Sequence, residues 1–345
     1  MGWRTAIQGP AVMGLLAICG LGPAAEPETA RYEFEQIRFA APVRLAFYAP
    51  SEPLANQLAE DVFRRLKEFD RIMSDYDPDS ELSQLCENSG PGRPVRVSDE
   101  LWAVIQASQA WSEATDGQFD ISLAPSVRLW RIARRKQALP TDEERREALA
   151  KSGWRSIVLD PDQQTVELRK PGMRLDLGGI AQGYAADEAM RILKAGGIVS
   201  AMVDVSGDIC VSAPPPGTGG WRIAIESPLG PDSPEGARVL LLRNAAVSTS
   251  GAAYQFVEIE GVRYSHIIDP ATGLGMTAAC TVTVIAPDAL TADGIDTALC
   301  LQGSERGLRT VAAHPGIEAM FSTLIDGRLE VVESPGFARW IAPAE

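Results

Sequence analysis

After Gly197 the chain becomes a succession of short apolar segments, and this change constrains the fold more than any other feature of the sequence. These segments show the alternation that is typical of strands, with few helical patterns between them. The predicted strands lie at 200–205, 221–226, 238–242, 256–260, 264–268, 281–285, 319–324 and 328–332, and one predicted helix, at 289–301, interrupts them. Strands that do not alternate regularly with helices favour an α+β fold over a doubly wound parallel sheet.

Most helical patterns come before Gly197. Apolar residues at helical spacing predict an amphipathic helix at 51–73. Ser98 is placed as an N-cap, and Thr141 with Glu144 forms a capping-box pattern. The other predicted elements are strands at 31–48, a helix at 99–115, a hairpin made of 154–159 and 165–168, and a helix at 179–195 that ends at two glycines.

The charge balance excludes two classes of partner. The 345 residues include 32 Lys and Arg against 46 Asp and Glu, which gives a net charge of −14. Such a chain lacks the electrostatic footprint of a protein that binds nucleic acid or anionic membranes. A hydrophobic share of 45% is typical of a folded globular protein, and the length suits one large domain or two ordinary ones.

The first 25 residues predict a secretory signal peptide. A single charge, Arg4, precedes an apolar run at 11–21 and small residues at 24–25. The run is shorter than the ~20 residues that a membrane-spanning helix needs. A disordered or cytoplasmic N-terminus is the alternative. Cleavage would remove Arg4 and change the net charge from −14 to −15.

The cysteines give little information about redox chemistry. Cys19 lies in a faint resemblance to a bacterial lipobox, although Ile18 is larger than the residue that usually precedes a lipidated cysteine. The remaining cysteines are Cys86, Cys210, Cys280 and Cys300, and no two of them have the spacing of a redox or zinc motif. The sequence does not show which of them, if any, form disulfides.

A glycine-rich junction is the first segment that suggests chemistry. In LDLGGIAQGYAADEA a predicted strand ends at Asp176 and runs through Gly178 and Gly179 into a helix. Glycines let the backbone approach a ligand, and a helix N-terminus offers N–H groups to an anion. A tight strand-to-helix turn is the alternative interpretation. In VDVSGDICV, Ser206-Gly207-Asp208 is interpreted as a hairpin turn in preference to a ligand-facing bend.

Histidine chemistry has two candidates, since the chain contains only His266 and His314. His266 lies near the end of the predicted strand at 264–268 and precedes Asp269, which suits a general base oriented by a carboxylate. A hydrogen-bonded structural histidine is the alternative. His314, before a proline, is interpreted as the end of a helix.

Oxygen ligands for a cation lie on the predicted helix at 289–301. Asp293 and Thr297 are four residues apart and share a face, and Asp296 lies beside Thr297. Carboxylate and hydroxyl oxygens suit a hard cation such as Mg²⁺. A solvated or cap-forming polar face is the alternative.

The order of these motifs is more specific than any one of them. From Met73 to Gly303 the chain contains MSDYDPDSELSQL, DGQFDISLAPSVRLW, LDLGGIAQGYAADEA, VSGDI, WRIAIESP, AVSTSG, YSHIIDPATG and TADGIDTALCLQG. This series resembles the FAD:protein FMN transferase family, the ApbE-like flavin transferases. The resemblance implies an ApbE-like (T-fold-like) α+β domain over 31–345, with a mainly antiparallel sheet and packed helices, after a signal peptide at 1–25.

The resemblance also implies an activity. Members of the family bind FAD and Mg²⁺, split the pyrophosphate, attach FMN through a phosphoester to a threonine or serine of a flavoprotein, and release AMP. They work outside the cytoplasm of bacteria, often as lipoproteins. We therefore expect a periplasmic or exported protein whose partner is an exported or membrane flavoprotein.

Individual roles follow from the family motifs. His266 is the expected catalytic base. The expected metal site consists of the Gly179 carbonyl with Asp293 and Thr297, and Asp296 as an extra ligand. The expected FAD contacts are Phe39, Tyr76, Gln118, Phe119, Asp120, Asp176, Gln182 and Ile267.

Two departures from the family pattern bear on these roles. Phe39-Ala40-Ala41 stands where many relatives have Met-Gly-Thr, so Phe39 must supply the ring contact. Gln182 stands where relatives often have lysine, and glutamine cannot offset pyrophosphate charge. An FAD pyrophosphatase that releases FMN and AMP, or a non-catalytic FAD-binding protein, are the alternative functions.

Overall fold

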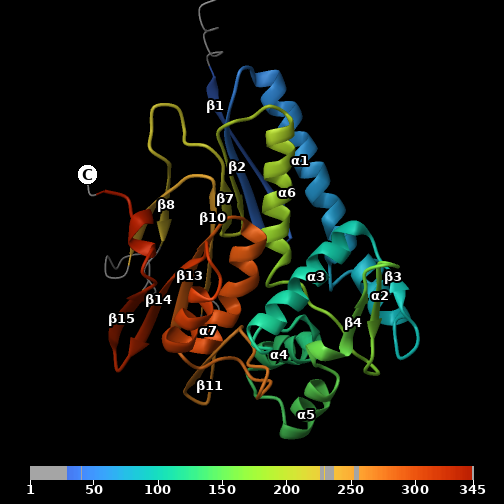
Figure 1. The fold of residues 1–345 in the computed structure, drawn as a ribbon. Helices are drawn as coiled ribbons and strands as arrows, with labels where there is room; N and C mark the ends of the chain where they lie inside the picture. The colour runs from blue at the N-terminus through green and yellow to red at the C-terminus, as the bar shows by residue number, and fades with distance from the viewer. Residues whose placement is uncertain (1–28, 40, 226–228, 230–236, 252–255, 344–345) are drawn as a thin grey trace, which may run out of the picture.

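The computed structural model describes residues 29–39, 41–225, 229, 237–251 and 256–343 (Figure 1). The predicted signal peptide, Cys19 and Ala40 lie outside these residues. Among the described residues, no helix is both long enough and apolar enough to cross a membrane.

An eight-stranded sheet forms the centre of the fold, and all its neighbouring strands are antiparallel. This confirms the α+β expectation. In spatial order the strands are β1 (Ala30–Arg38), β2 (Ala41–Ala49), β6 (Ala201–Val205), β7 (Asp208–Val211), β10 (Ala245–Gly251), β13 (Cys280–Ala286), β14 (Glu318–Ile325) and β15 (Arg328–Glu333).

Three long helices, α1 (Glu52–Met73), α6 (Ala181–Ala195) and α7 (Ala289–Ala312), pack on one face of this sheet (Figure 1). The hairpin of β8 (Trp221–Ile225) and β9 (Arg238–Leu242) contributes to a separate apolar cluster with side chains of the sheet. Val284 of β13 belongs to the first cluster and Ile285 to the second, so β13 is buried on both faces. This explains its almost continuous apolar sequence.

The helix that holds the predicted metal ligands is broken close to the residue at which its sequence pattern predicts its end. Its sequence pattern predicts an end at 301, whereas α7 extends to Ala312 with a break at Gly303. Gly303 has a φ of 68°, which an L side chain rarely adopts, so the helical path is interrupted there.

The segment between α1 and α6 forms a layer of short elements beside the sheet. It contains α2 (Glu81–Asn88), α3 (Asp99–Ala114), the short helix η1 (Ile121–Leu123), α4 (Ala124–Lys136), α5 (Asp142–Ala150), η2 (Trp154–Ser156), and a small sheet of β3 (Val95–Arg96), β5 (Thr165–Leu168) and β4 (Ile157–Asp160). Ser98 caps α3, and Thr141 and Glu144 form the predicted capping box.

Several elements differ from the sequence predictions. The patterns do not predict α2, α4 or β10. The hairpin turn predicted at 206–208 is present between β6 and β7. The strand predicted at 264–268 is β12 (Val262–Ser265), which pairs with β11 (Phe256–Ile259). The chain leaves β12 before His266, and Ile268 then forms an isolated bridge with Gly275. The family motif around His266 therefore lies in a turn.

Candidate functional site

The predicted site residues, scattered from Phe39 to Thr297, line one cavity of about 730 Å³. This volume is within the range typical of small-molecule sites. The structure therefore brings together all of the candidates: Phe39, Tyr76, Gln118, Phe119, Asp120, Asp176, Gly179, Gln182, His266, Ile267, Asp293, Asp296 and Thr297.

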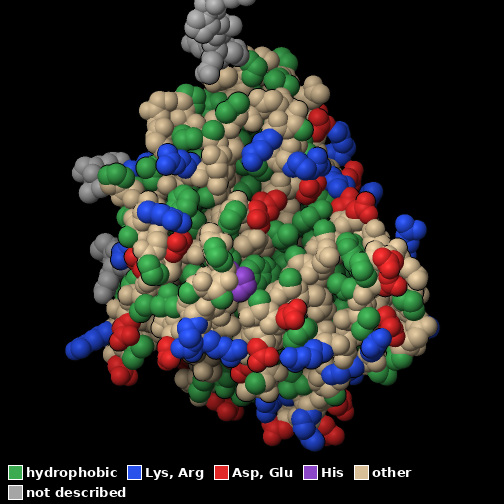
Figure 2. Space-filling view, in the orientation of Figure 1, with side chains coloured by type: hydrophobic (Ala, Val, Ile, Leu, Met, Phe, Trp, Pro, Cys, Tyr) green, Lys and Arg blue, Asp and Glu red, His purple; other side chains and the backbone are tan. Residues whose placement is uncertain are grey.

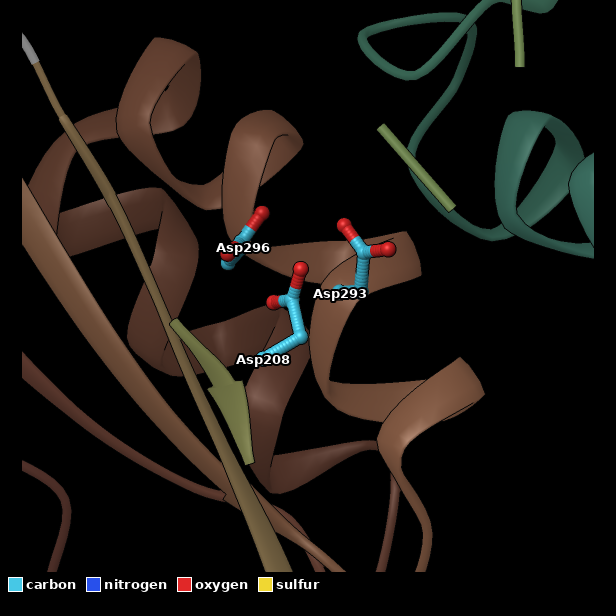
Figure 3. A group of neighbouring side chains, drawn as sticks. All are labelled: Asp208, Asp293 and Asp296. Carbon is cyan, nitrogen blue, oxygen red and sulfur yellow. The ribbon is translucent and has the colours of Figure 1, made fainter. Parts of the chain in front are cut away.

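Three buried aspartates lie close together, two near the N-terminus of α7 and one at the start of β7. Asp208, Asp293 and Asp296 each offer a carboxylate oxygen, and these oxygens lie within 4.8 Å of one another (Figure 3). The three residues are 7%, 5% and 3% exposed. No described lysine or arginine forms an ion pair with them. The interpretation of 206–208 as a simple turn therefore missed a member of this cluster.

Hydrogen bonds fix the orientation of two of the three carboxylates. Asp293 Oδ2 accepts the Gly183 amide at 2.8 Å, and Asp296 Oδ2 accepts the Ser248 hydroxyl at 2.5 Å. The Thr297 hydroxyl donates to Asp296 Oδ1 at 3.2 Å. Each bond leaves other lone pairs of the carboxylates available to a ligand.

The electrostatics of the cluster favour a bound cation. Burial raises the pKa of Asp208 to about 7, and burial together with the neighbouring Asp208 carboxylate raises the pKa values of Asp293 and Asp296. Three ionised carboxylates in so small a volume repel one another unless they bind protons or a cation. Their oxygens are the donors that Mg²⁺ prefers, so the residues present fit that metal.

Gly179 lies beside Thr297, another of the expected metal ligands. A Cβ atom on Gly179 would lie 3.7 Å from the Thr297 hydroxyl oxygen and 3.5 Å from the Phe119 ring. Gln182 lies in the first turn of α6, on the wall of the cavity. The glycine junction thus lies beside a cavity and the metal candidates, which favours the ligand-binding interpretation over a purely structural turn.

Arg131 of α4 contacts several side chains in another part of the cavity wall. Its guanidinium group bridges Asp75 Oδ2 at 2.5 Å and Asp176 Oδ2 at 2.9 Å, and it lies 4.4 Å from the centroid of the Tyr76 ring. Tyr76 is 75% exposed, so its other ring face is open to a ligand. Burial raises the pKa of Asp176, with the Asp75 carboxylate as a second cause. Sequence patterns did not indicate Arg131.

The Gln118 to Asp120 segment forms another part of the wall. Phe119 is buried, and Gln118 is half-buried beside it. The Asp120 carboxylate accepts the amides of Ser122 at 2.8 Å and Trp154 at 3.0 Å. These bonds give Asp120 a role in holding the segment, in addition to its place on the cavity wall. Burial raises its pKa.

His266 is half-buried on the wall of the cavity. The backbone around it is fixed, since the Ile267 amide donates to Ser265 Oγ at 3.1 Å and its carbonyl accepts the Met276 amide at 2.8 Å. The hydrogen-bond partners observed for the Asp269 carboxylate, the expected orienting group, lie in its own turn. The Asp269 carboxylate accepts the Ala271 amide at 2.8 Å and the Thr272 hydroxyl at 3.3 Å, so it stabilises its own turn.

His314 has a structural environment, as the sequence indicated. It follows the end of α7, its Nδ1 lies 2.8 Å from the Thr310 carbonyl oxygen, and its ring packs on Trp111 with centroids 5.2 Å apart. It does not line the cavity, so His266 is the histidine available to chemistry there.

Comparison with known proteins identifies the family. The sequence matches the model of the ApbE family over residues 39–321. The chain belongs to the ApbE family. Its relatives include an FAD:protein FMN transferase of Treponema pallidum, 32% identical over 321 residues that cover 88% of each chain, and one of Vibrio cholerae, 32% identical over 280 residues that cover 80% of this chain and 83% of the relative.

Solved ApbE structures share the fold. The flavin transferase ApbE from Vibrio cholerae matches with a TM-score of 0.82 and 28% identity, over 91% of this chain and all of that one. The ApbE protein from Thermotoga maritima matches with a TM-score of 0.80 and 29% identity, over 91% of this chain and 100% of the other. The ApbE fold expected from the motif series is thereby confirmed.

Proposed function

We propose that this ApbE protein is a Mg²⁺-dependent FAD:protein FMN transferase that attaches FMN to a threonine or serine of a target flavoprotein and releases AMP. The main support is the cavity that is lined both by three buried carboxylates and by His266. The names of the relatives support the flavin and transfer parts of the proposal.

The cluster on α7 and β7 would hold the metal. Asp293, Asp296, Thr297 and Asp208 offer side-chain oxygens, and the Gly179 carbonyl is the expected backbone ligand. When bound, Mg²⁺ supplies positive charge that neutralises the oxygens of a pyrophosphate. An acidic protein needs such a local charge to bind the anion FAD.

The other residues bind and orient the flavin nucleotide. Tyr76 and Phe119 offer flat apolar surfaces to a ring, and Phe39 lines the same cavity. Gln182 has an amide that can donate a hydrogen bond but carries no charge. Asp176, fixed by Arg131, presents a carboxylate whose orientation is already determined.

His266 would act as the base. A threonine or serine hydroxyl has a high pKa, so its proton must move to an acceptor as the oxygen attacks phosphorus. The imidazole would take this proton while the phosphoester bond forms and the bond to the AMP phosphate breaks. The hydrogen bonds of the Ile267 backbone fix the chain beside His266 and so the position from which its ring extends.

The location and partner follow from the same proposal. The N-terminal sequence suits export to the periplasm, where an exported or membrane-bound flavoprotein would present the acceptor hydroxyl. A lipid anchor at Cys19 is a weaker expectation, because Ile18 departs from the usual pattern.

One experiment tests the proposal against the two alternatives. Purified protein is incubated with FAD, Mg²⁺ and candidate acceptor flavoproteins, and covalent flavin is detected by fluorescence on a denaturing gel. Labelled acceptor with release of AMP is expected. Release of FMN and AMP without labelling would instead identify a pyrophosphatase, and FAD that stays intact would identify a binding protein.

A further inference from the structure

A second, smaller cavity of about 350 Å³ adjoins the site. It shares the lining residues Arg131 and Arg134 with the main cavity, so the two lie side by side. We call it the arginine groove. It is lined by Arg131, Arg134, Arg135, Gln137, Phe256 and Val257.

The groove lies between the last turn of α4 and the β11–β12 hairpin. Phe256 begins β11 and pairs with Ser265, the residue directly before His266. The wall of the groove and the candidate base are therefore parts of one hairpin. A chain segment that reaches His266 from this side must pass the arginines of α4.

The charge of the groove contrasts with that of the whole protein. The chain has a net charge of −14, yet Arg134, Arg135 and Lys136 follow one another at the end of α4. Neither Arg134 nor Arg135 forms an ion pair with a described residue. Basic side chains also gather over the part of the surface where α4 and β11 lie (Figures 1 and 2).

A helix-dipole effect explains only part of this arrangement. Cations in the last turn of a helix stabilise it by interacting with its dipole. That effect does not account for an aromatic side chain, Phe256, that is 42% exposed on the opposite wall. Phe256 also packs against the guanidinium group of Arg263, which lies 3.5 Å from the ring centroid.

We propose that the arginine groove binds carboxylate side chains of the acceptor protein, in the segment next to the threonine or serine that receives FMN. This inference rests on the proposed transferase function. Arginine pairs with carboxylates through two parallel hydrogen bonds, which would fix the direction of the segment as well as attract it. The acidic surface elsewhere would repel such a segment, so the groove would also set where it docks.

The competing ligand is FAD itself, whose phosphates also attract arginine. Arg131 and Arg134 line both cavities, whereas Arg135 lines only the groove. Arg135→Glu therefore separates the two ligands. The matched control reverses charge at Arg309, an exposed residue of α7 outside both cavities.

The probe is a short fluorescein-labelled peptide with aspartates on both sides of one threonine, and its partner has asparagines in place of the aspartates. Binding to the full chain is measured by anisotropy at low and high salt, and FAD binding by quenching of flavin fluorescence. We expect the aspartate peptide to bind more tightly than the asparagine peptide, with an advantage that falls as salt rises. Arg135→Glu should lower the affinity for the aspartate peptide about tenfold, and Arg309→Glu should change this affinity less than about twofold.

Two results would overturn the inference. One is equal binding of the two peptides by the wild-type protein. The other is an Arg135→Glu variant whose affinity for FAD falls while its affinity for the aspartate peptide equals that of the wild type. This result would assign the groove to the nucleotide. Because peptide binding is measured without turnover, absence of flavin transfer by the wild-type protein would refute the proposed function separately.

Discussion

The Asp293 carboxylate accepts the backbone amide of Gly183 at 2.8 Å, and this bond joins α7 to the first turn of α6. The contact is possible because the two helices approach closely at a glycine. A Cβ atom on Gly183 would lie 2.3 Å from the Ala289 carbonyl oxygen and 2.8 Å from Asp293 Cβ. The position of a candidate metal ligand therefore depends on a residue without a side chain.

Gly183→Ala should lower both stability and metal affinity. The added methyl meets backbone atoms that cannot rotate away, so the helices must separate, at a cost of about 1–3 kcal/mol in the free energy of unfolding. Urea denaturation measures the loss, and Mg²⁺ titration measures the affinity. Gly219→Ala is the matched control, because its Cβ would meet only Leu241 Cδ2, at 3.5 Å. Equal stability of the two variants would contradict the close-packing explanation.

Asp208→Asn should affect the apo and metal-bound states in opposite directions. Without metal, the substitution removes one of three mutually repelling carboxylates, so the melting temperature should rise. With Mg²⁺, loss of a ligand charge should weaken binding by roughly tenfold or more and reduce the metal-induced rise in melting temperature. Thermal denaturation with and without Mg²⁺ measures both effects.

The control for Asp208 is Asp162→Asn, an exposed turn residue that should change neither measurement. A wild-type response to Mg²⁺ in the Asp208 variant would remove Asp208 from the metal site and leave the α7 ligands alone.

The sequence predicted the site better than it predicted the elements that build it. Asp293 and Thr297 were accessible to prediction because helical spacing places them on one face. Asp208 was interpreted as part of a turn, since nothing local shows that β7 lies beside β10 and under α7. The motif VSGDI was the available signal, through its place in the family series.

Arg131 illustrates what local patterns cannot reveal. Its partners, Asp75 and Asp176, are 56 and 45 residues away in the chain, so only the tertiary fold brings them together. The helix that holds Arg131, α4, was also not predicted from the sequence. Long-range pairing of this kind has no periodic signal.

Arg131→Gln should weaken FAD binding, because Asp176 and Tyr76 would lose the side chain that holds them on the cavity wall. Glutamine keeps a polar amide but loses the charge that bridges two carboxylates and the contact with the Tyr76 ring. We expect FAD affinity to fall about tenfold, since two charge-assisted pairs and one cation–π contact are lost. Flavin fluorescence titration measures it. Arg155→Gln, whose guanidinium lies over Trp154 outside the cavity, is the control and should bind FAD normally.

His266→Ala should abolish transfer while FAD stays bound. Removal of a general base lowers the rate by about 10²–10⁴-fold, and the nucleotide contacts are supplied by other residues. Turnover and FAD affinity are measured on the same preparation. His314→Ala should lower stability modestly, through its contact with Trp111, and leave turnover of the folded protein unchanged. Turnover in the His266 variant equal to wild type would exclude it as the base.

Asp187 should make stability depend on pH through the junction of α6 and α7. Its carboxylate accepts the Ala289 and Leu290 amides, both at 2.9 Å, yet burial outweighs these bonds and raises its pKa from 3.8 to about 6. The folded state then binds this proton more tightly than the unfolded state. Its contribution to stability is therefore fully present below about pH 4 and is lost as the pH rises to about 6.

The size of this effect is at most about 3 kcal/mol, from a shift of about two pKa units. Asp187→Asn removes the titrating group, so the free energy of unfolding should fall less steeply between pH 4 and 6 than in the wild type. Urea denaturation across this range, without Mg²⁺, gives both slopes. Asp162→Asn should keep the wild-type slope, because Asp162 is exposed. Identical slopes for the Asp187 variant and wild type would show that the two amide bonds, and not burial, control its ionisation.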